Sequence, residues 1–243
     1  RLAKQRSNLI FGAKSPAEEK ALAAECLVLA QRAVAANTNH AKAHLALAIC
    51  YAKNFPYCDN QTKVDYSRLL KQEAERAIEL DPKLDLAYHM LGRWHREVAG
   101  MNFVVKAIAK MAYGGLPKGS HAEAAASFKK AVELDPQRII HRFHLGKTLL
   151  ALDQKKAAIE EFQLCLTLTP KDMDDTEAQG FARERLGNVA GARSDYDEAL
   201  RLNPGYILAL TNRGSLRKKL GDGAGALEDA TEALRRDPSA ANA

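Results

Sequence analysis

Histidine pairs are the residues of this chain whose types and spacing could support chemistry. His40 and His44 lie four positions apart, so that a helix would place both on one face. His141 and His144, three positions apart, would share a face in the same way. Such pairs occur in zinc sites, but structural zinc takes four ligands, and no nearby cysteine or acidic cluster completes either set. We therefore expect ordinary surface or groove histidines, and neither a metal nor another cofactor.

One glycine-rich segment, residues 221–225, has some likeness to a phosphate-binding loop. It consists of Gly-Asp-Gly-Ala-Gly and lacks the Lys and Ser or Thr that complete a P-loop. We interpret it as a turn between helices. The sequence contains no recognisable pairing of a nucleophile with a base. These observations predict a protein that is not an enzyme and that takes no small-molecule substrate.

The spacing of proline and glycine indicates which elements position these residues. Prolines recur every 34 residues, at Pro136, Pro170, Pro204 and Pro238. Glycines follow the same period, at Gly146, Gly180 and Gly214. A fixed period of this length is typical of tandem helical repeats with one helix–turn–helix in each period. Stacks of such helix pairs form long curved surfaces, which bind other proteins.

The repeat has a regular internal pattern when each proline is placed at position 32 of a 34-residue unit. Position 8 is glycine in each unit, and small residues also occupy positions 20 and 27, the latter being Cys165, Ala199 and Ala233. Position 24 holds Phe162, Tyr196 and Ala230. Small residues would let two helices approach closely, a ring at position 24 would fill the gap between neighbouring pairs, and proline would end the second helix. This pattern resembles the tetratricopeptide-repeat family, which implies an all-α, right-handed superhelical solenoid.

The period also divides the chain into expected units. Pro82 precedes Pro136 by 54 residues, which is 20 more than one period, so one unit carries an insertion at about residues 101–120. We predict an irregular N-terminal helix pair over residues 1–37 and five repeats within 38–243. The expected bounds of the repeats are 41–84, 85–138, 139–172, 173–206 and 207–240.

The ends of several elements are predicted from local signals. Ser15-Pro16 is a typical helix start and predicts a helix over residues 17–36, with residues 1–11 as its partner. A loop longer than usual is expected at 55–64, and residues 239–243 resemble the start of another helix. Because no polar capping helix follows and the chain does not begin with Met, we expect both ends to be incomplete, which leaves targeting signals open.

The start of the fourth repeat departs from the pattern. Thr176 and Gln179 occupy positions where large apolar residues belong. Either this helix begins late, or residues are missing from the sequence between about 175 and 180. The unbroken register across the junction favours a late start.

Composition narrows the class of protein further. The four cysteines form no CxxC motif, and Cys26 and Cys165 fall at small-residue positions, which predicts buried free thiols and a reducing compartment. No apolar run is long enough for an integral membrane segment. The net charge of +6 is a mild excess of Lys and Arg. It fits exposed helix faces or, alternatively, a preference for an acidic partner, and we expect no nucleic acid to bind.

The predicted insertion contains a short basic and apolar helix. Phe103, Val104, Ile108 and Met111 would share one helical face, with Lys106 and Lys110 interspersed. We expect this helix to pack on the edge of the solenoid with its apolar face in the core. The alternatives are docking on a partner or on a membrane, of which the membrane is the less favoured because lysines are few.

The residues around the insertion resemble a particular family. Leu91-Gly92-Arg93-Trp94, Glu97-Val98-Ala99, the inserted helix, its Gly/Leu-Pro break and the residues from Ala124 to Phe128 are similar to those of the regulator of microtubule dynamics family. The resemblance spans about Ala17 to Gln179; beyond it the chain resembles generic repeats. It implies association with microtubules and spindle poles, and in some members the tethering of organelle membranes.

The first helices of such repeats line a protein-binding groove, which provides the candidate site. Family positions place these residues there: Leu86, His89, Met90, Arg93, Arg96, Ile140, Phe143, His144, Lys147, Phe181, Arg185, Asn212, Lys218 and Lys219. The mixture of apolar and basic residues suits an extended peptide or a helix. The Lys/Asn/Arg set with which chaperone-binding members hold a C-terminal carboxylate is not matched, so we do not expect that activity.

These observations predict a non-catalytic scaffold that binds other proteins, in a microtubule-based assembly such as the axoneme. The expected partners are tubulin or microtubule-associated subunits, and the expected location is cytoplasmic and cytoskeletal, including the cilium. The alternatives are an organelle-surface adaptor anchored by a segment outside this sequence, or the repeat domain of a larger enzyme.

Overall fold

The structure, a computed structural model, describes residues 15–236. Over this range it consists of α-helices and turns with one short 3-10 helix, and no strand occurs there. The elements are α2 (Pro16–Ala36), α3 (Ala41–Asn54), η2 (Phe55–Tyr57), α4 (Asn60–Leu80), α5 (Asp85–Gly100), α6 (Phe103–Tyr113), α7 (His121–Leu134), α8 (Ile139–Ala151), α9 (Lys155–Thr167), α10 (Met173–Arg185), α11 (Val189–Leu202), α12 (Ile207–Lys219) and α13 (Gly223–Arg236).

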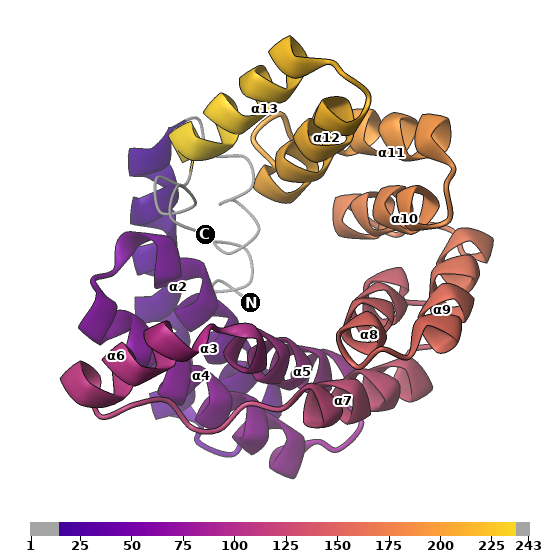
Figure 1. The fold of residues 1–243 in the computed structure, drawn as a ribbon. Helices are drawn as coiled ribbons and strands as arrows, with labels where there is room; N and C mark the ends of the chain where they lie inside the picture. The colour runs from indigo at the N-terminus through magenta and orange to yellow at the C-terminus, as the bar shows by residue number, and fades with distance from the viewer. Residues whose placement is uncertain (1–14, 237–243) are drawn as a thin grey trace.

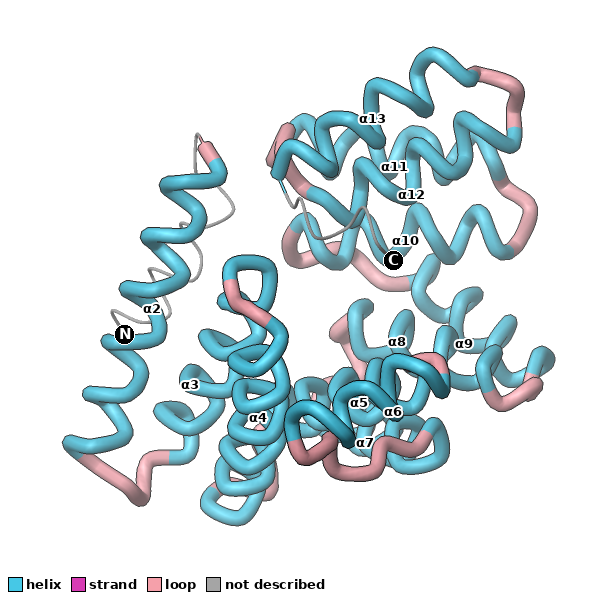
Figure 2. The backbone as a smooth tube through the Cα atoms, turned by 60° about the vertical axis from the view of Figure 1, so that its left-hand side comes forward, coloured by secondary structure: helices cyan, strands magenta, loops and turns pink. Residues whose placement is uncertain are grey.

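Helices pack in consecutive pairs: α3 with α4, α5 with α7, α8 with α9, α10 with α11, and α12 with α13. Figure 1 shows these pairs following one another around a curve, with α8, α10 and α12 on its inner side and α9, α11 and α13 outside. The turns that join most of the helices are short (Figure 2). The curve returns to its start, since Arg236 of α13 forms an ion pair of 3.3 Å with Glu19 of α2. The predicted all-α solenoid is confirmed.

Within a pair, the glycine at position 8 makes room for the ring at position 24. A Cβ on Gly146 would lie 2.5 Å from Cε1 of Phe162, and a Cβ on Gly180 would lie 2.7 Å from Cε1 of Tyr196. Distances below 3.0 Å are too short for a real Cβ, so only glycine lets these helices approach so closely. The ring at position 24 therefore packs within its own pair as well as against the next one, where Phe162 lies 5.8 Å from Phe181.

Hydrogen bonds at the N-caps confirm one predicted helix start, that of α2, and correct another, that of α4. The start of α2 is as expected, because the Ser15 hydroxyl accepts a hydrogen bond from the Glu18 N–H at 3.2 Å. The prediction of a long loop at 55–64 is wrong, because a 3-10 helix and the first turn of α4 occupy most of it. The Asp59 carboxylate accepts from the Thr62 N–H at 2.8 Å, so that α4 begins at Asn60. The helices predicted at 1–11 and 239–243 lie outside the described residues.

The late start predicted for the fourth repeat is also wrong. α10 begins at Met173, and its N-cap Asp172 accepts from the Asp175 N–H at 3.0 Å. Gln179 is buried at an apolar position because its amide donates to the Cys165 and Leu168 carbonyls, at 2.9 and 2.7 Å. These carbonyls end the preceding helix, so a polar side chain satisfies groups that an apolar one would leave unpaired.

The prediction of free thiols is wrong for Cys26. Cys26 of α2 and Cys50 of α3 form a disulfide, with their Cα atoms 5.8 Å apart. Both are buried where the two helices approach closely, and small residues at such positions come within bonding distance of each other. Cys165 is free and buried as expected, and burial raises the pKa of its thiol to about 12. Cys26 therefore no longer supports the expectation of a reducing compartment.

The inserted helix forms where it was predicted, but its packing differs from the prediction. α6 is capped at its start by Asn102 and ends at Tyr113, where its C-cap Gly114 has a φ of 73°, in the left-handed region. Its apolar face is exposed rather than part of the core. The reason lies in the neighbouring pair: α5 and α7 pack directly against each other, and the connection after α6 passes so close to α5 that a Cβ on Gly119 would lie 2.7 Å from Val98. α6 is thus placed outside the pair, beside α4 (Figure 1).

None of the helices between Ser15 and Arg236 combines the length and apolar character needed to cross a bilayer.

Candidate protein-binding surface

The predicted groove residues lie on the inner helices α5, α8, α10 and α12, but they do not form one open surface. Five are buried: His89, Met90, Phe143, His144 and Phe181. Four are exposed: Arg93, Arg185, Lys218 and Lys219. The others are partly buried: Leu86, Arg96, Ile140, Lys147 and Asn212. Because neighbouring inner helices contact one another, about half of the predicted set is used to join them.

A cluster of three histidines and an arginine joins α5 to α8. His89 Nδ1 lies 3.0 Å from His141 Nδ1, and His141 Nε2 lies 2.9 Å from a carboxylate oxygen of Asp85. Arg96 donates to His144 Nδ1 at 2.5 Å. A neutral His141 that donates to Asp85 can accept from the Nδ1–H of His89, so one tautomer satisfies both contacts.

Burial and nearby charge keep His89 and His144 of this cluster neutral. Burial lowers the pKa of His89 and that of His144 well below the usual value, and nearby charge adds to it: His141 next for His89, and Arg96 next for His144. The hydrogen bond from His141 lowers the pKa of Asp85. The expectation of surface or groove histidines is therefore wrong for this cluster, whose rings act as polar packing groups.

In the other predicted histidine pair, His40 and His44, one of the two rings is also buried and hydrogen-bonded. His40 is exposed, whereas His44 is buried and contacts a Glu73 carboxylate oxygen at 2.5 Å and the Thr38 carbonyl at 2.9 Å. Among the described residues, no three His, Cys, Asp or Glu side chains are grouped so that they could hold a metal ion.

A second cluster combines two rings with two cations between α8 and α10. The rings of Phe143 and Phe181 meet edge to face at 5.1 Å. Lys147 Nζ lies 5.3 Å from both ring centroids, and the Arg185 guanidinium lies 4.8 Å from that of Phe181. The faces of the rings attract the charged ends of these side chains and hold them in place. Burial, followed by the Arg96 charge, lowers the pKa of Lys147. This cluster can offer positive charge to a carboxylate beside an apolar surface.

Acidic residues occupy part of the same inner surface. Burial raises the pKa of Glu177 to about 7, against the opposing effect of Lys147. The Asn212 amide bonds to Glu177, and Lys219 contacts Glu184 at 2.5 Å. Asn212 and Lys219 are thus engaged within the chain, and Lys218 on α12 is exposed beside them.

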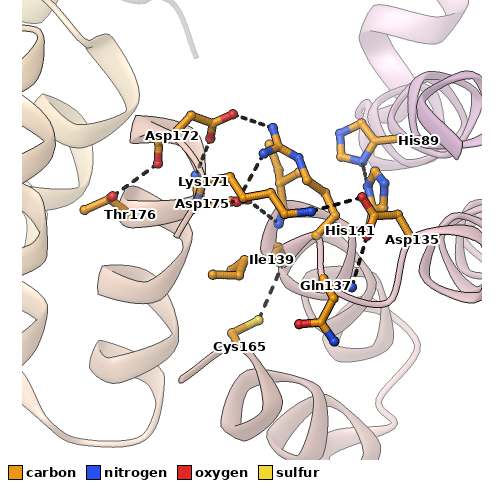
Figure 3. A network of polar contacts seen from close by, with 12 residues as sticks. His89, Asp135, Gln137, Ile139, His141, Cys165, Lys171, Asp172, Asp175 and Thr176 are labelled. Carbon is orange, nitrogen blue, oxygen red and sulfur yellow. Dashed lines mark hydrogen bonds and ion pairs between the residues drawn. The ribbon is translucent and has the colours of Figure 1, made fainter. Parts of the chain in front are cut away.

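A polar network that the sequence interpretation missed fixes α10 against α8. Arg138 donates to Asp172 at 2.6 Å and to Asp175 at 3.1 Å, and the other Asp175 oxygen accepts from the Ile140 N–H at 3.0 Å. Figure 3 shows Asp172 and Asp175 directed toward the start of α8, and Lys171 reaching Asp135. Asp172 could have been identified as an N-cap from its position directly before the helix. The network sets the spacing of the two inner helices that hold the ring–cation cluster.

Helix pairs of this length, stacked with their first helices inside, define a tetratricopeptide-repeat protein. The profile described as "Tetratricopeptide repeat" matches residues 178–241. Two solved structures share the fold: a thermophilic tetratricopeptide-repeat protein of Thermus thermophilus (TM-score 0.55, 16% identity, 88% of this chain and 98% of that one) and a chain of the Cut9–Hcn1 hetero-tetramer of APC/C (TM-score 0.57, 15% identity, 96% and 46%).

The profile described as "Regulator of microtubule dynamics protein 1-3" matches residues 1–190, and the chain belongs to this family. Regulator of microtubule dynamics protein 1 of Mus musculus is 34% identical over 145 residues, which are 59% of this chain and 48% of the relative. Regulator of microtubule dynamics protein 3 of Xenopus laevis is 29% identical over 191 residues, 78% of this chain and 41% of the relative. The chain thus spans about half or less of the length of these relatives. The predicted resemblance is confirmed, and the match extends beyond its expected bounds at both ends.

Proposed function

We propose that this chain is a non-catalytic scaffold that binds other proteins and acts in a microtubule-based assembly such as the axoneme. The observation that carries the proposal is a series of cations on successive inner helices: Arg93 on α5, Lys147 on α8, Arg185 on α10 and Lys218 on α12. Microtubule surfaces are acidic, and a series of cations on a curved surface attracts an acidic partner. Membership of a family named for microtubule dynamics supports the same partner.

The contacts within the inner surface support binding of an acidic peptide in particular. Lys147 and Arg185 are held over the Phe143 and Phe181 rings. Ordering these two side chains on binding therefore costs less conformational entropy than ordering free ones. A tubulin or microtubule-associated segment with carboxylates beside apolar residues would match both components. Cytoskeletal association, including the cilium, follows from this proposal.

Co-pelleting with microtubules over a series of salt concentrations tests the proposal. The triple variant Arg93→Glu, Arg185→Glu, Lys218→Glu should lose most of its binding. A matched control, Lys20→Glu, Lys129→Glu, Lys156→Glu, makes the same change in net charge at exposed lysines of α2, α7 and α9, and should keep most of it. Failure of the unaltered chain to pellet at low salt would contradict direct contact with microtubules. An equal loss in both triples would show that net charge, and not the inner surface, determines binding.

One observation favours an alternative, an adaptor at an organelle surface: the exposed apolar face of α6. Such an adaptor would be anchored by a segment outside this sequence. A repeat domain of a larger enzyme is the remaining alternative. Imaging the full-length protein in cells, together with identification of the proteins that purify with it, distinguishes the three: microtubules, an organelle surface, or an associated catalytic domain.

A further inference from the structure

The inserted helix α6 exposes more apolar surface than its length would suggest. Phe103 and Met111 are 83% and 89% exposed, and Val104, Val105 and Ile108 are exposed as well. Within α6, Ala109 is the one residue that is buried. A helix of 11 residues with five large apolar side chains in water carries a cost that a helix in the core would not.

The exposed side chains lie on one side of the helix. At 100° per residue, the five fall within an arc of about 200°, centred near Val104 and Met111. The opposite side carries Ala109 and Tyr113, which are the buried and half-buried positions facing the fold. The apolar arc is therefore directed away from the solenoid.

The solenoid holds α6 in this orientation by its C-terminal end. The Arg68 guanidinium of α4 donates to the Tyr113 carbonyl at 2.6 Å and to the Gly115 carbonyl at 2.6 and 3.1 Å. These bonds satisfy carbonyls that the helix itself leaves unpaired. Figure 1 shows α6 at the outer rim of the curve, where a broad surface could reach it.

The charged side chains of this segment are all basic, and Asp65 of α4, near the C-terminal end of α6, is paired with Arg68 at 2.9 Å. At 100° per residue, Lys110 borders the arc beside Phe103, whereas Lys106 lies on the side of Tyr113. Lys118 follows in the connection to α7, and no Asp or Glu occurs from residue 98 to residue 122. Lys110 is exposed, and Lys106 donates to the Ala99 carbonyl at 2.9 Å. The occupant of this surface must therefore be apolar within and negatively charged at its edge.

We propose that α6 docks on the surface of an anionic lipid bilayer, with Phe103, Ile108 and Met111 among the acyl chains and the lysines at the headgroups. Basic helices with a wide apolar arc bind at such surfaces. A second copy of this chain fits less well, because α6 on α6 would bring like-charged lysines together. A protein groove also fits less well, because protein interfaces are depleted in lysine and need hydrogen-bonding partners, and the Asn102 side chain already caps the helix.

The test measures co-sedimentation of the chain with vesicles of phosphatidylcholine, with and without phosphatidylserine. The chain should bind the anionic vesicles, weakly and in a salt-dependent way, and the neutral ones far less. Phe103→Ser with Met111→Ser should weaken binding at least about tenfold, since burying the two side chains together contributes more than 1.4 kcal/mol. Lys106→Gln with Lys110→Gln should weaken binding to anionic vesicles and reduce its salt dependence. All four positions are exposed, so thermal unfolding should remain unchanged.

A matched control uses exposed leucines elsewhere on the solenoid. Leu202→Ser with Leu227→Ser removes apolar side chains of α11 and α13 that are 52% and 68% exposed, and it should leave vesicle binding unchanged. In a separate variant, Phe103→Trp should give a blue shift in fluorescence on addition of anionic vesicles, against a constant contribution from Trp94, which is buried.

Three outcomes would overturn the proposal. These are no binding to anionic vesicles, equal binding to neutral ones, or an equal loss in the leucine control. A dimer in solution that the Phe103/Met111 variant dissociates, without vesicle binding, would assign the surface to a second copy instead. Microtubule pelleting by the Phe103/Met111 variant should match that of the unaltered chain, so that failure here is separate from failure of the proposed scaffold function.

Discussion

Two helix pairs differ in the side chain that packs against the glycine at position 8: one uses an apolar ring and the other a charged carboxylate. In the α8–α9 pair, Gly146 leaves space for the Phe162 ring, which is 1% exposed. In the α12–α13 pair, position 24 is Ala230, and Gly214 instead faces Asp229, whose Cβ would lie 3.2 Å from an added Cβ. Both pairs keep the glycine, but one fills the contact with a ring and the other with a carboxylate.

The surroundings of the two contacts follow from that choice. Phe162 continues into an apolar cluster through the Phe181 ring of the next pair. Asp229 is buried and is held by Arg213 at 2.6 Å and by Arg217 at 3.0 Å. The first contact depends on volume, and the second depends on paired charge. A repeat can therefore keep the geometry of its helix pair whether the contact at the glycine is stabilised by burial of an apolar ring or by ion pairs.

The largest expected effect is that of removing the ring. Phe162→Ala should lower the free energy of unfolding by about 3–5 kcal/mol, because it leaves a cavity where the side chain is fully buried. Urea denaturation followed by far-UV circular dichroism measures this loss. Phe103→Ala, which removes an equal ring from the exposed face of α6, is the matched control and should leave stability within about 0.5 kcal/mol. Equal losses in both would contradict the burial assigned to Phe162.

The carboxylate of the other pair should have the next largest effect. Asp229→Asn keeps the size of the side chain but leaves Arg213 and Arg217, both largely buried, without their shared partner. We expect a loss of about 2–3 kcal/mol, below the full value for a buried pair because Arg213 also contacts Asp197. The measurement is urea denaturation at low and high salt. A loss as large as that of Phe162→Ala, or none, would show that the two contacts do not differ as described.

Adding one methyl group to each glycine sharpens the comparison. Gly146→Ala should cost about 1–3 kcal/mol, because its Cβ would meet the Phe162 ring at 2.5 Å. Gly214→Ala should stay within about 1 kcal/mol of the unaltered chain, since 3.2 Å is nearly tolerable and alanine favours the helix. Thermal unfolding of the two variants side by side measures the difference. The prediction fails if Gly214→Ala is the more destabilising of the two.

The period of the sequence was sufficient to predict the regular part of this fold. Ala41, Asp85, Ile139, Met173 and Ile207 are the expected first residues of repeats, and each begins a helix. Proline at position 32 and glycine at position 8 act within their own helix pair, so their effect is local and can be inferred from one sequence. The same is true of the Ser15 cap and of the bounds of α6.

What the sequence could not show depends on contacts between distant residues. His89 and His141 are 52 residues apart, and nothing near either one indicates the other. The pairing of Cys26 with Cys50 depends on how α2 packs on α3, and α2 lies outside the 34-residue period. The apolar pattern of α6 is the same for a buried face as for an exposed one, so periodicity alone predicted a core helix.

The smallest expected effect is the pH dependence of stability that buried histidines cause. It distinguishes the part of the chain that contains histidines from the C-terminal helix pairs, since no histidine follows His144. Burial holds the pKa values of His89 and His144 well below those of the unfolded chain. Well above the unfolded pKa of about 6.5 both states are neutral and stability is constant. As the pH falls toward and below that value, the unfolded chain binds protons that the folded one excludes, so these histidines lower stability.

From about pH 7 to about pH 6, we expect His89 and His144 to lower the free energy of unfolding by about 1 kcal/mol, half from each, against an opposing gain from Glu177, whose pKa of about 7 lets the folded chain bind a proton over the same range. Urea denaturation followed by the fluorescence of Trp94 measures it, because this one tryptophan is buried on α5, the helix that carries His89. His144→Phe, which replaces one titrating ring with a ring that can keep the 5.5 Å stacking on Phe128, should remove about half of the histidine contribution and shift the pH dependence by that amount. An unchanged pH dependence in that variant would assign the effect to other groups and remove the distinction between the two regions.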